Sequence, residues 1–326
     1  MTVRLSRRQL MACAGLGLGA AAAAAAPVPP DPEDKPRPSE PFGYCLNTGT
    51  IRGQKLDPAE EAQVAAKAGY RGLEPWVGAI QAYAERGGSL PDLKKRIADL
   101  GLSVESAIGF ADWINDDGAK RAAGLEQMRR DMDLVARIGG KRIGVPPSGA
   151  YNTPNMDLLR VAERYRQVLQ LGREAGVVPQ LELWGGSKTL RRLGEVAFVL
   201  VEAAHPDACA LLDVFHIYRG GSDFAGLRLL NGSAMHVFHI NDYPADPPRD
   251  KANDSHRVYP GDGVAPMSAI LRDLHASGFR GMLSLELFNR EYWKQDALAV
   301  ARTGLEKIKA AVAKAMGTSD RTLRFG

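Results

Sequence analysis

Eight short apolar runs recur along the chain, and most are followed by a turn and a longer amphipathic stretch. They span residues 42–46, 71–75, 102–108, 141–145, 178–184, 209–215, 235–241 and 281–287. Runs of this length without strict alternation are typical of strands that are buried on both faces of a parallel sheet. Parallel strands need long crossover connections, usually helices, so the pattern is compatible with few folds.

Helical patterns occupy most of the intervals between these runs, at residues 58–67, 93–100, 120–138, 156–175, 190–204, 267–277 and 296–316. Eight strand–helix units in about 275 residues predict a single-domain (β/α)8 TIM barrel over residues 42–316. An open doubly wound sheet is the alternative. That fold favours a glycine-rich phosphate loop after its first strand, and Asn47-Thr48-Gly49-Thr50 does not provide one.

The two ends of the chain have a different character from the rest. Residues 1–26 contain the pair Arg7-Arg8 and then an apolar Gly/Ala-rich run, which predicts a signal peptide of the twin-arginine type. We interpret residues 27–41 as a proline-rich linker and residues 317–326 as a C-terminal tail. These features predict export to a bacterial periplasm without stable membrane insertion once the signal is removed. A retained anchor is the alternative, although the apolar run is shorter than the ~20 residues that a span needs.

Charge and cysteine content set further bounds. Removing Arg4, Arg7 and Arg8 with the signal lowers the formal net charge from +4 to about +1, which does not favour a nucleic-acid partner. Cys45 and Cys209 remain, and both lie in expected strands, where a cysteine usually behaves as a small buried apolar residue. We therefore expect no disulfide framework.

Polar residues end four consecutive expected strands, namely Glu182, Asp213, His239 and Glu286. The active site of a (β/α)8 barrel lies at this end of the strands. Burying three carboxylates together without a cation would cost several kcal/mol per charge. Three carboxylates and one imidazole suit a divalent ion of the Mn, Mg, Co or Zn type, among which the sequence does not choose. For any single carboxylate, a salt bridge to Lys or Arg is the alternative.

Five short motifs near these strand ends resemble those of the xylose isomerase-like TIM barrels in the sugar phosphate isomerase/epimerase family. They are Glu-Leu-Trp at 182–184, Asp-x-x-His at 213–216, Phe-His-Ile-x-Asp at 238–242, Arg-Val-Tyr-Pro-Gly-Asp-Gly at 257–263 and Leu-Glu-Leu-Phe at 285–288. The resemblance implies that Glu182, Asp213, His239 and Glu286 are metal ligands. It also implies that Glu182 and Glu286 form the catalytic acid/base pair, on opposite sides of the substrate.

The resemblance also implies a set of substrate-binding residues: His216, Arg257, Glu74 and Trp184. His216 would donate to a substrate oxygen or, alternatively, orient Asp213. Arg257 would anchor the substrate, although Tyr259 departs from the family's motif. Glu74 would bind substrate hydroxyls, orient a ligand or cap a helix. Trp184 would form apolar walls with three further aromatic residues, Trp76, Trp113 and Phe288.

These residues predict an isomerase or epimerase that removes a proton alpha to the carbonyl of a keto-sugar or keto-inositol, with one divalent metal ion as cofactor. The alternatives are a lyase or dehydratase acting on a keto-glycoside or inosose with the same metal site, and a noncatalytic exported sugar-binding protein. A DNA-repair endonuclease of the related three-zinc type is disfavoured, because few of the six histidines end a strand. The expected partner is a small carbohydrate, and a homo-oligomer stays open.

Overall fold

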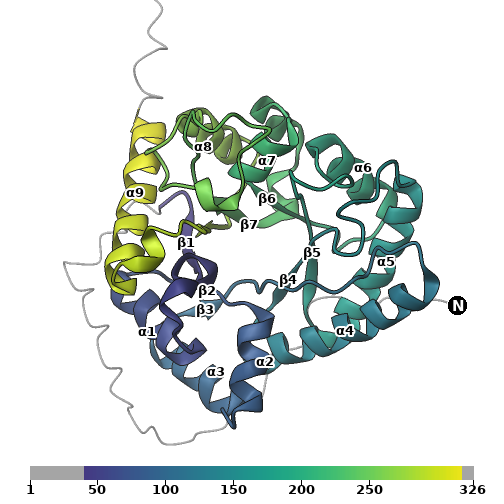
Figure 1. Ribbon diagram of the computed structural model, residues 1–326, viewed down its shortest axis with the longest axis horizontal. Helices are drawn as coiled ribbons and strands as arrows, with labels where there is room; N and C mark the ends of the chain where they lie inside the picture. The colour runs from purple at the N-terminus through teal and green to yellow at the C-terminus, as the bar shows by residue number, and fades with distance from the viewer. Residues whose placement is uncertain (1–39, 318–326) are drawn as a thin grey trace, which may run out of the picture. The chain divides into compact units, whose positions relative to one another are not determined.

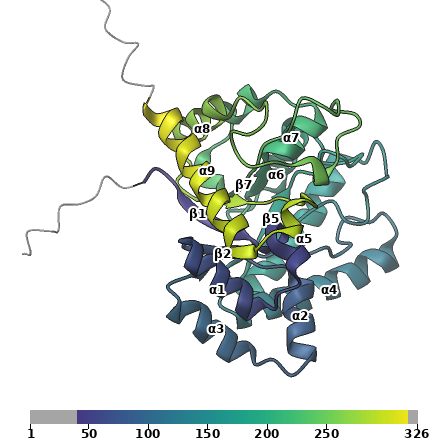
Figure 2. The ribbon, with the colours of Figure 1, turned by 60° about the vertical axis from the view of Figure 1, so that its left-hand side comes forward.

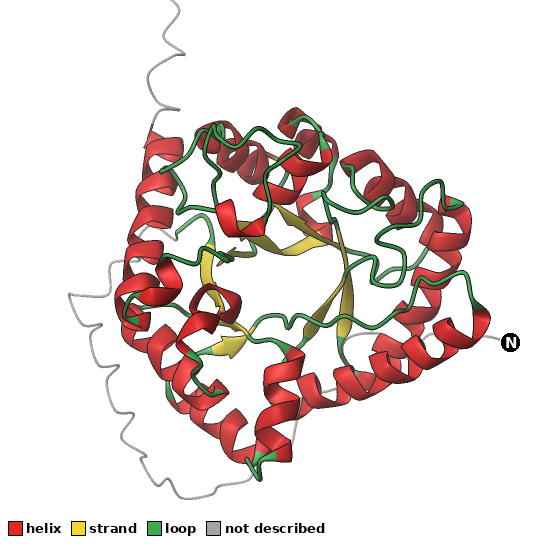
Figure 3. Cartoon of the chain, viewed as in Figure 1, coloured by secondary structure: helices red, strands yellow, loops and turns green. Residues whose placement is uncertain are grey.

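The computed structural model describes residues 40–317, in which eight parallel strands are ringed by helices (Figure 1, Figure 3). The strands are β1 (Gly43–Asn47), β2 (Gly72–Glu74), β3 (Ser103–Val104), β4 (Arg142–Val145), β5 (Val178–Glu182), β6 (Ala210–Asp213), β7 (Met235–Ile240) and β8 (Met282–Leu285). Each of them falls within, or overlaps, one of the eight expected strands.

The helices are α1 (Pro58–Ala68), α2 (Val77–Glu85), α3 (Leu90–Asp99), α4 (Gly118–Arg137), α5 (Leu158–Ala175), α6 (Leu193–Ala203), α7 (Val214–Gly220), α8 (Met267–Ala276) and α9 (Ala297–Gly317). Short 3-10 turns are η1 (Thr48–Gln54), η2 (Phe224–Leu229), η3 (Gly232–Ala234), η4 (Asp254–His256) and η5 (Tyr292–Lys294). Helix α9 packs against both α1 and α8, which joins the two ends of the helical ring (Figure 2).

The sheet closes on itself to form a barrel. Regular ladders give the order β3-β2-β1-β8-β7-β6-β5-β4, with every pairing parallel. The segment after β3 completes the ring, because Ile108 N donates to Pro75 O at 3.0 Å and Gly144 N donates to Ala107 O at 2.8 Å. The predicted (β/α)8 TIM barrel is confirmed.

Two helices were not expected from the sequence. Helix α2 has the sequence VGAIQAYAE, whose only polar residues, Gln81 and Glu85, give a weak amphipathic pattern. Helix α7 follows directly from β6, and its apolar first residues extend the apolar run that predicts a strand over 209–215. The strand ends instead at Asp213, whose side chain accepts a hydrogen bond from His216 N at 2.7 Å and thereby caps α7. His216 consequently lies on a helix rather than in a loop.

Local sequence explains where several helices begin and end. Asp57 and Glu60 form a capping box at the start of α1, and Gly69 ends that helix with φ +100°. The side chains of Asp117 and Asp157 accept hydrogen bonds from backbone N–H groups in the first turns of α4 and α5. These caps define where the helices that cover the barrel begin and end.

Cys45 and Cys209 are both free and buried, as expected. Within residues 40–317, no helix combines the length and apolar character that crossing a membrane would require. The expected signal peptide at 1–26, nearly all of the linker at 27–41 and nearly all of the tail at 317–326 lie outside the described residues.

Candidate metal centre and its cavity

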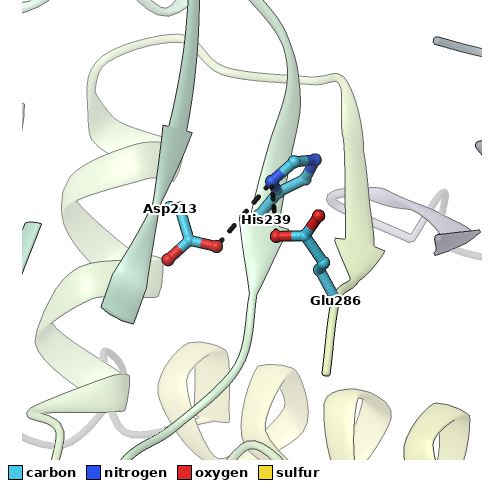
Figure 4. A group of neighbouring side chains, drawn as sticks. All are labelled: Asp213, His239 and Glu286. Atoms are coloured by element: carbon cyan, nitrogen blue, oxygen red, sulfur yellow. Dashed lines mark ion pairs between the residues drawn. The ribbon is translucent and has the colours of Figure 1, made fainter. Parts of the chain in front are cut away.

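Three of the four residues expected as metal ligands converge at the carboxyl end of the barrel. Asp213 ends β6, His239 lies in β7 and Glu286 follows β8; the three strands are neighbours in the sheet. One ligand atom of each lies within 4.8 Å of the others. His239 Nδ1 is 3.2 Å from Glu286 Oε2 and 3.7 Å from Asp213 Oδ2 (Figure 4). All three side chains are buried, so the group is a potential metal site.

Glu74 fixes the orientation of the imidazole in this group. Its Oε2 lies 2.9 Å from His239 Nε2 and also accepts hydrogen bonds from Asn47 Nδ2 and Ser284 Oγ. The other ring nitrogen, Nδ1, is therefore directed toward Asp213 and Glu286. Glu74 is fully buried and does not line the cavity. This geometry favours the ligand-orienting role over the expected contact with substrate hydroxyls.

Two asparagines hold the carboxylates in place, and the sequence analysis missed both. Asn241 Nδ2 donates to Asp213 Oδ2 at 2.9 Å, and Asn47 Nδ2 donates to Glu286 Oε1 at 3.1 Å. Each asparagine lies at or just beyond the end of a strand, β1 or β7, which is the one sequence signal that could have identified it.

Arg257 is fully buried beside the same carboxylates. Its Nη1 donates to Asp213 Oδ2 at 2.9 Å and to Glu286 Oε2 at 2.7 Å, while Nη2 donates to Asp254 Oδ1 at 2.6 Å. Nη2 also lies 3.2 Å from His216 Nε2. Arg257 therefore pairs with two of the expected ligands, which is the alternative that the sequence left open for a single carboxylate. It also lines the cavity, where its expected role as a substrate anchor stays a prediction.

Glu182 lies apart from the three-residue group but faces the same cavity. It ends β5 and is only 3% exposed, and within residues 40–317 its Oε2 has no hydrogen-bond partner. Burial raises the pKa of Glu182 to about 8.

The charged groups of the cluster have opposite tendencies. Burial opposes ionisation of Glu286, but His239 and Arg257 outweigh it and lower the pKa of this carboxyl. Burial likewise opposes protonation of His239, but Glu286 and Glu74 raise the pKa of the imidazole well above its ordinary value. Removal from solvent lowers the pKa of His216, which favours its neutral form. Without a metal, Arg257 and a protonated His239 thus offset part of the negative charge of the surrounding carboxylates.

A cavity of about 500 Å³ opens above the cluster, a size typical of small-molecule sites. Trp184 lines it as expected, together with Trp76 and Phe288. Further wall residues that the sequence did not reveal are Phe110, Tyr151, Phe215 and Trp293. Phe110 lies between Trp76 and Trp184, with ring centroids 5.1 Å and 6.0 Å away, so the wall is continuous. Trp113 was expected in this wall, but it is fully buried and donates to Pro146 O at 2.6 Å.

The residues present fit a divalent ion. Glu182 Oε2 is a buried polar atom without a hydrogen-bond partner in the part of the chain that the structure describes. Buried polar atoms are normally satisfied, so this oxygen indicates that something else binds in the cavity. His239 Nδ1 faces two carboxylates, at 3.2 Å from Glu286 Oε2 and 3.7 Å from Asp213 Oδ2, an arrangement that a cation can join. Asp213 and Glu286 add further carboxylate oxygens, and this mixture of oxygen and imidazole ligands suits a divalent ion of the Mn, Mg, Co or Zn type.

The chain belongs to the xylose isomerase-like TIM barrel family, whose sequence profile matches residues 62–311. Among its relatives is the inosose isomerase of Bacillus velezensis, with 32% identity over 47% of this chain and 55% of that protein. The chain spans about half the length of the first curated relatives that it matches.

Two other comparisons cover more of the barrel. Fructoselysine 3-epimerase of Escherichia coli O157:H7 is 26% identical over 81% of this chain and 98% of that protein. The solved structure of the IOLI protein with a bound zinc atom superimposes with a TM-score of 0.76 at 21% identity, covering 84% of this chain and 99% of that one. The likeness to the IOLI structure shows that the two chains share a fold.

Proposed function

We propose that the chain is a divalent-metal-dependent isomerase or epimerase that acts on a keto-sugar or keto-inositol by proton transfer alpha to the carbonyl. The observation that carries the proposal is the convergence of Asp213, His239 and Glu286 beneath a cavity that Glu182 also lines. The similarity to an inosose isomerase and a fructoselysine 3-epimerase supports the same class of reaction.

In this proposal Asp213, His239, Glu286 and Glu182 hold the ion. When bound, it would supply electrophilic stabilisation of the negative charge that develops on the substrate oxygens during proton removal. Glu74 keeps His239 Nδ1 directed at this position through its 2.9 Å contact with Nε2. The ion is of the Mn, Mg, Co or Zn type.

Glu182 is our candidate for the base that removes the proton. It lines the cavity, and its Oε2 has no hydrogen-bond partner in the described residues, so this oxygen is available to take a proton from a bound substrate. Glu286 lines the same cavity and is the candidate for returning the proton on the other face. His216, in its neutral form, can hydrogen-bond a substrate oxygen, and Trp184 offers a flat surface for the C–H face of a sugar.

The test is proton exchange with solvent. Metal-loaded protein is incubated with candidate ketoses in heavy water, and deuterium at the alpha carbon is measured by NMR. We expect incorporation by the unaltered chain and its loss in Glu182→Gln. A noncatalytic sugar-binding protein would bind ketoses in a metal-dependent manner without any exchange, and that outcome would refute the proposal.

One observation favours a lyase or dehydratase as the second candidate. Glu286 is paired with Arg257, whereas Glu182 has no such partner in the described residues, so one carboxylate is better placed to act as base than the other. A single base acting on a substrate with a beta oxygen leaving group would lead to elimination. Analysis of the product from a keto-glycoside distinguishes the two, since elimination leaves an unsaturated product and epimerisation does not.

We also propose that the protein works outside the cytoplasm, on the basis of Arg7-Arg8 and the apolar run that follows. Replacing both arginines by lysine is expected to leave the protein in the cytoplasmic fraction. Periplasmic recovery of that variant would contradict this part of the proposal.

A further inference from the structure

Three arginines line the cavity, Arg52, Arg219 and Arg290. Arg52 and Arg290 are exposed and Arg219 is half-buried, so they lie toward the open, outer end of the cavity. They come from three different segments at the carboxyl end of the barrel: η1 after β1, helix α7 after β6, and the loop after β8. Arg219 lies three residues after His216 on α7, so the two side chains share one face of that helix. The cationic groups are thus gathered around the same opening from separate directions.

None of these three arginines forms an ion pair with a carboxylate anywhere in residues 40–317. The acidic residues that line the cavity are Glu182, Asp254 and Glu286. Asp254 and Glu286 are bound by Arg257, at 2.6 Å and 2.7 Å. Two of the three cavity acids are therefore engaged by Arg257, the third, Glu182, is buried at the end of β5, and Arg52, Arg219 and Arg290 are left without a carboxylate partner in the described residues.

The aromatic wall of the cavity strengthens the attraction of the three arginines for an anion. The Arg52 guanidinium lies 4.5 Å from the centroid of the Trp76 ring, and the remaining wall is largely aromatic. A guanidinium stacked on an aromatic ring is held in place and keeps its N–H groups free for an anion. Three like charges around one concave, mainly aromatic surface repel each other unless a bound anion offsets them.

We propose that the substrate carries an anionic group, a carboxylate or a phosphate, and that Arg52, Arg219 and Arg290 bind it at the outer end of the cavity. The reacting carbonyl then lies at the inner end, near Glu182 and Glu286, so the ligand is an acidic sugar rather than a neutral one. Guanidinium groups bind both carboxylate and phosphate through paired N–H donors, so the two sources share one recognition chemistry. This inference deepens the proposed function, on which its account of the inner end rests.

Binding of three ligands with one skeleton tests the inference: D-fructose, D-fructuronate and D-fructose 6-phosphate. Trp76, Trp184 and Trp293 line the cavity, so intrinsic tryptophan fluorescence of the full chain reports occupancy without turnover. We expect at least one acidic ligand to bind about tenfold or more tightly than fructose, and the ratio to fall with rising salt. The acidic ligand with the greater advantage identifies carboxylate or phosphate as the preferred group.

Substitutions locate the effect. In the double variant Arg219→Gln/Arg290→Gln, the dissociation constant of fructose divided by that of the preferred acidic ligand is expected to approach one. The matched control is Arg228→Gln, because Arg228 pairs with Asp273 outside the cavity, and its ratio is expected to equal that of the unaltered chain. Equal affinity for acidic and neutral ligands, failure of both acidic ligands to bind, or an unchanged ratio in the double variant would overturn the inference.

The same ligands separate this inference from the proposed function. Deuterium exchange into fructose, together with no preference for the acidic ligands, would refute the anion site and still support the isomerase proposal. Tight, arginine-dependent binding of an acidic ligand, with no deuterium exchange for any of the three ligands, would support the anion site and refute the isomerase proposal.

Discussion

Replacing Arg257 by glutamine removes the cation that neutralises the buried carboxylates. The guanidinium is fully buried and donates to Asp213 at 2.9 Å and Glu286 at 2.7 Å. Breaking a buried pair by removing one partner costs about 3–5 kcal/mol, because the remaining charge is left uncompensated. At about 2–4 °C per kcal/mol for a domain near this size, the metal-free variant should melt roughly 6–20 °C lower than the unaltered chain.

The assay is thermal unfolding of both proteins with chelator and then with a saturating divalent ion. The ion would replace the missing positive charge beside Asp213 and Glu286, so we expect the gap in Tm to shrink on metal addition. The control is Arg219→Gln, which lines the same cavity without an acid partner in the described chain and should change stability by no more than about 0.5 kcal/mol. The reasoning would be refuted if Arg257→Gln and the unaltered chain had the same Tm in chelator. It would also be refuted if the divalent ion left the difference between their Tm values unchanged.

Three further predictions concern single residues. Glu74→Gln should weaken metal binding about 10–100-fold, measured by competition with a chromophoric chelator, since Glu74 orients His239; unchanged affinity would argue against that role. In metal-free protein, folded Glu182 stays protonated up to about pH 8, whereas its unfolded carboxyl ionises near 4.5. The folded state therefore holds more protons between these values, so the free energy of unfolding should fall as pH rises through them, and Glu182→Gln should reduce that slope in urea titrations. Asp242 accepts hydrogen bonds from three backbone N–H groups after β7, and Asp242→Ala should cost about 2–3 kcal/mol in the same titrations; a loss below 0.5 kcal/mol, roughly a surface effect, would contradict this.

The barrel was predictable because its strands and helices differ in period and length. Continuous apolar runs bounded by turns marked all eight strands, and turn signals such as Gly69 and Gly176 marked the ends of two helices. Helix α7 was missed because its residues continue the apolar run of β6, and only the capping bond from His216 N to Asp213 separates the two elements. A capping aspartate and a strand-end ligand look the same in sequence, and Asp213 is placed to be both.

The site was predictable only in part. Asp213, His239 and Glu286 could be found because polar residues at buried strand ends are costly without a purpose. Glu74 could be proposed to orient a ligand, but its contact with His239 could not be predicted, and neither could the hydrogen bond from Asn47 to Glu286. Closure of the barrel brings these pairs together over long sequence separations. Nor does sequence reveal that Arg257 reaches the carboxylates, since the loop that carries it must first fold over the barrel mouth.

Metal analysis of the purified full chain is the most direct test of the central claim, that Asp213, His239 and Glu286 form a divalent-ion centre. We predict close to one ion per chain, lost in Asp213→Asn and in Glu286→Gln. Glu126→Gln, which alters an exposed carboxylate on α4, should keep the ion. A chain that binds no divalent ion, or ion content that stays the same in the Asp213 and Glu286 variants, would contradict the account.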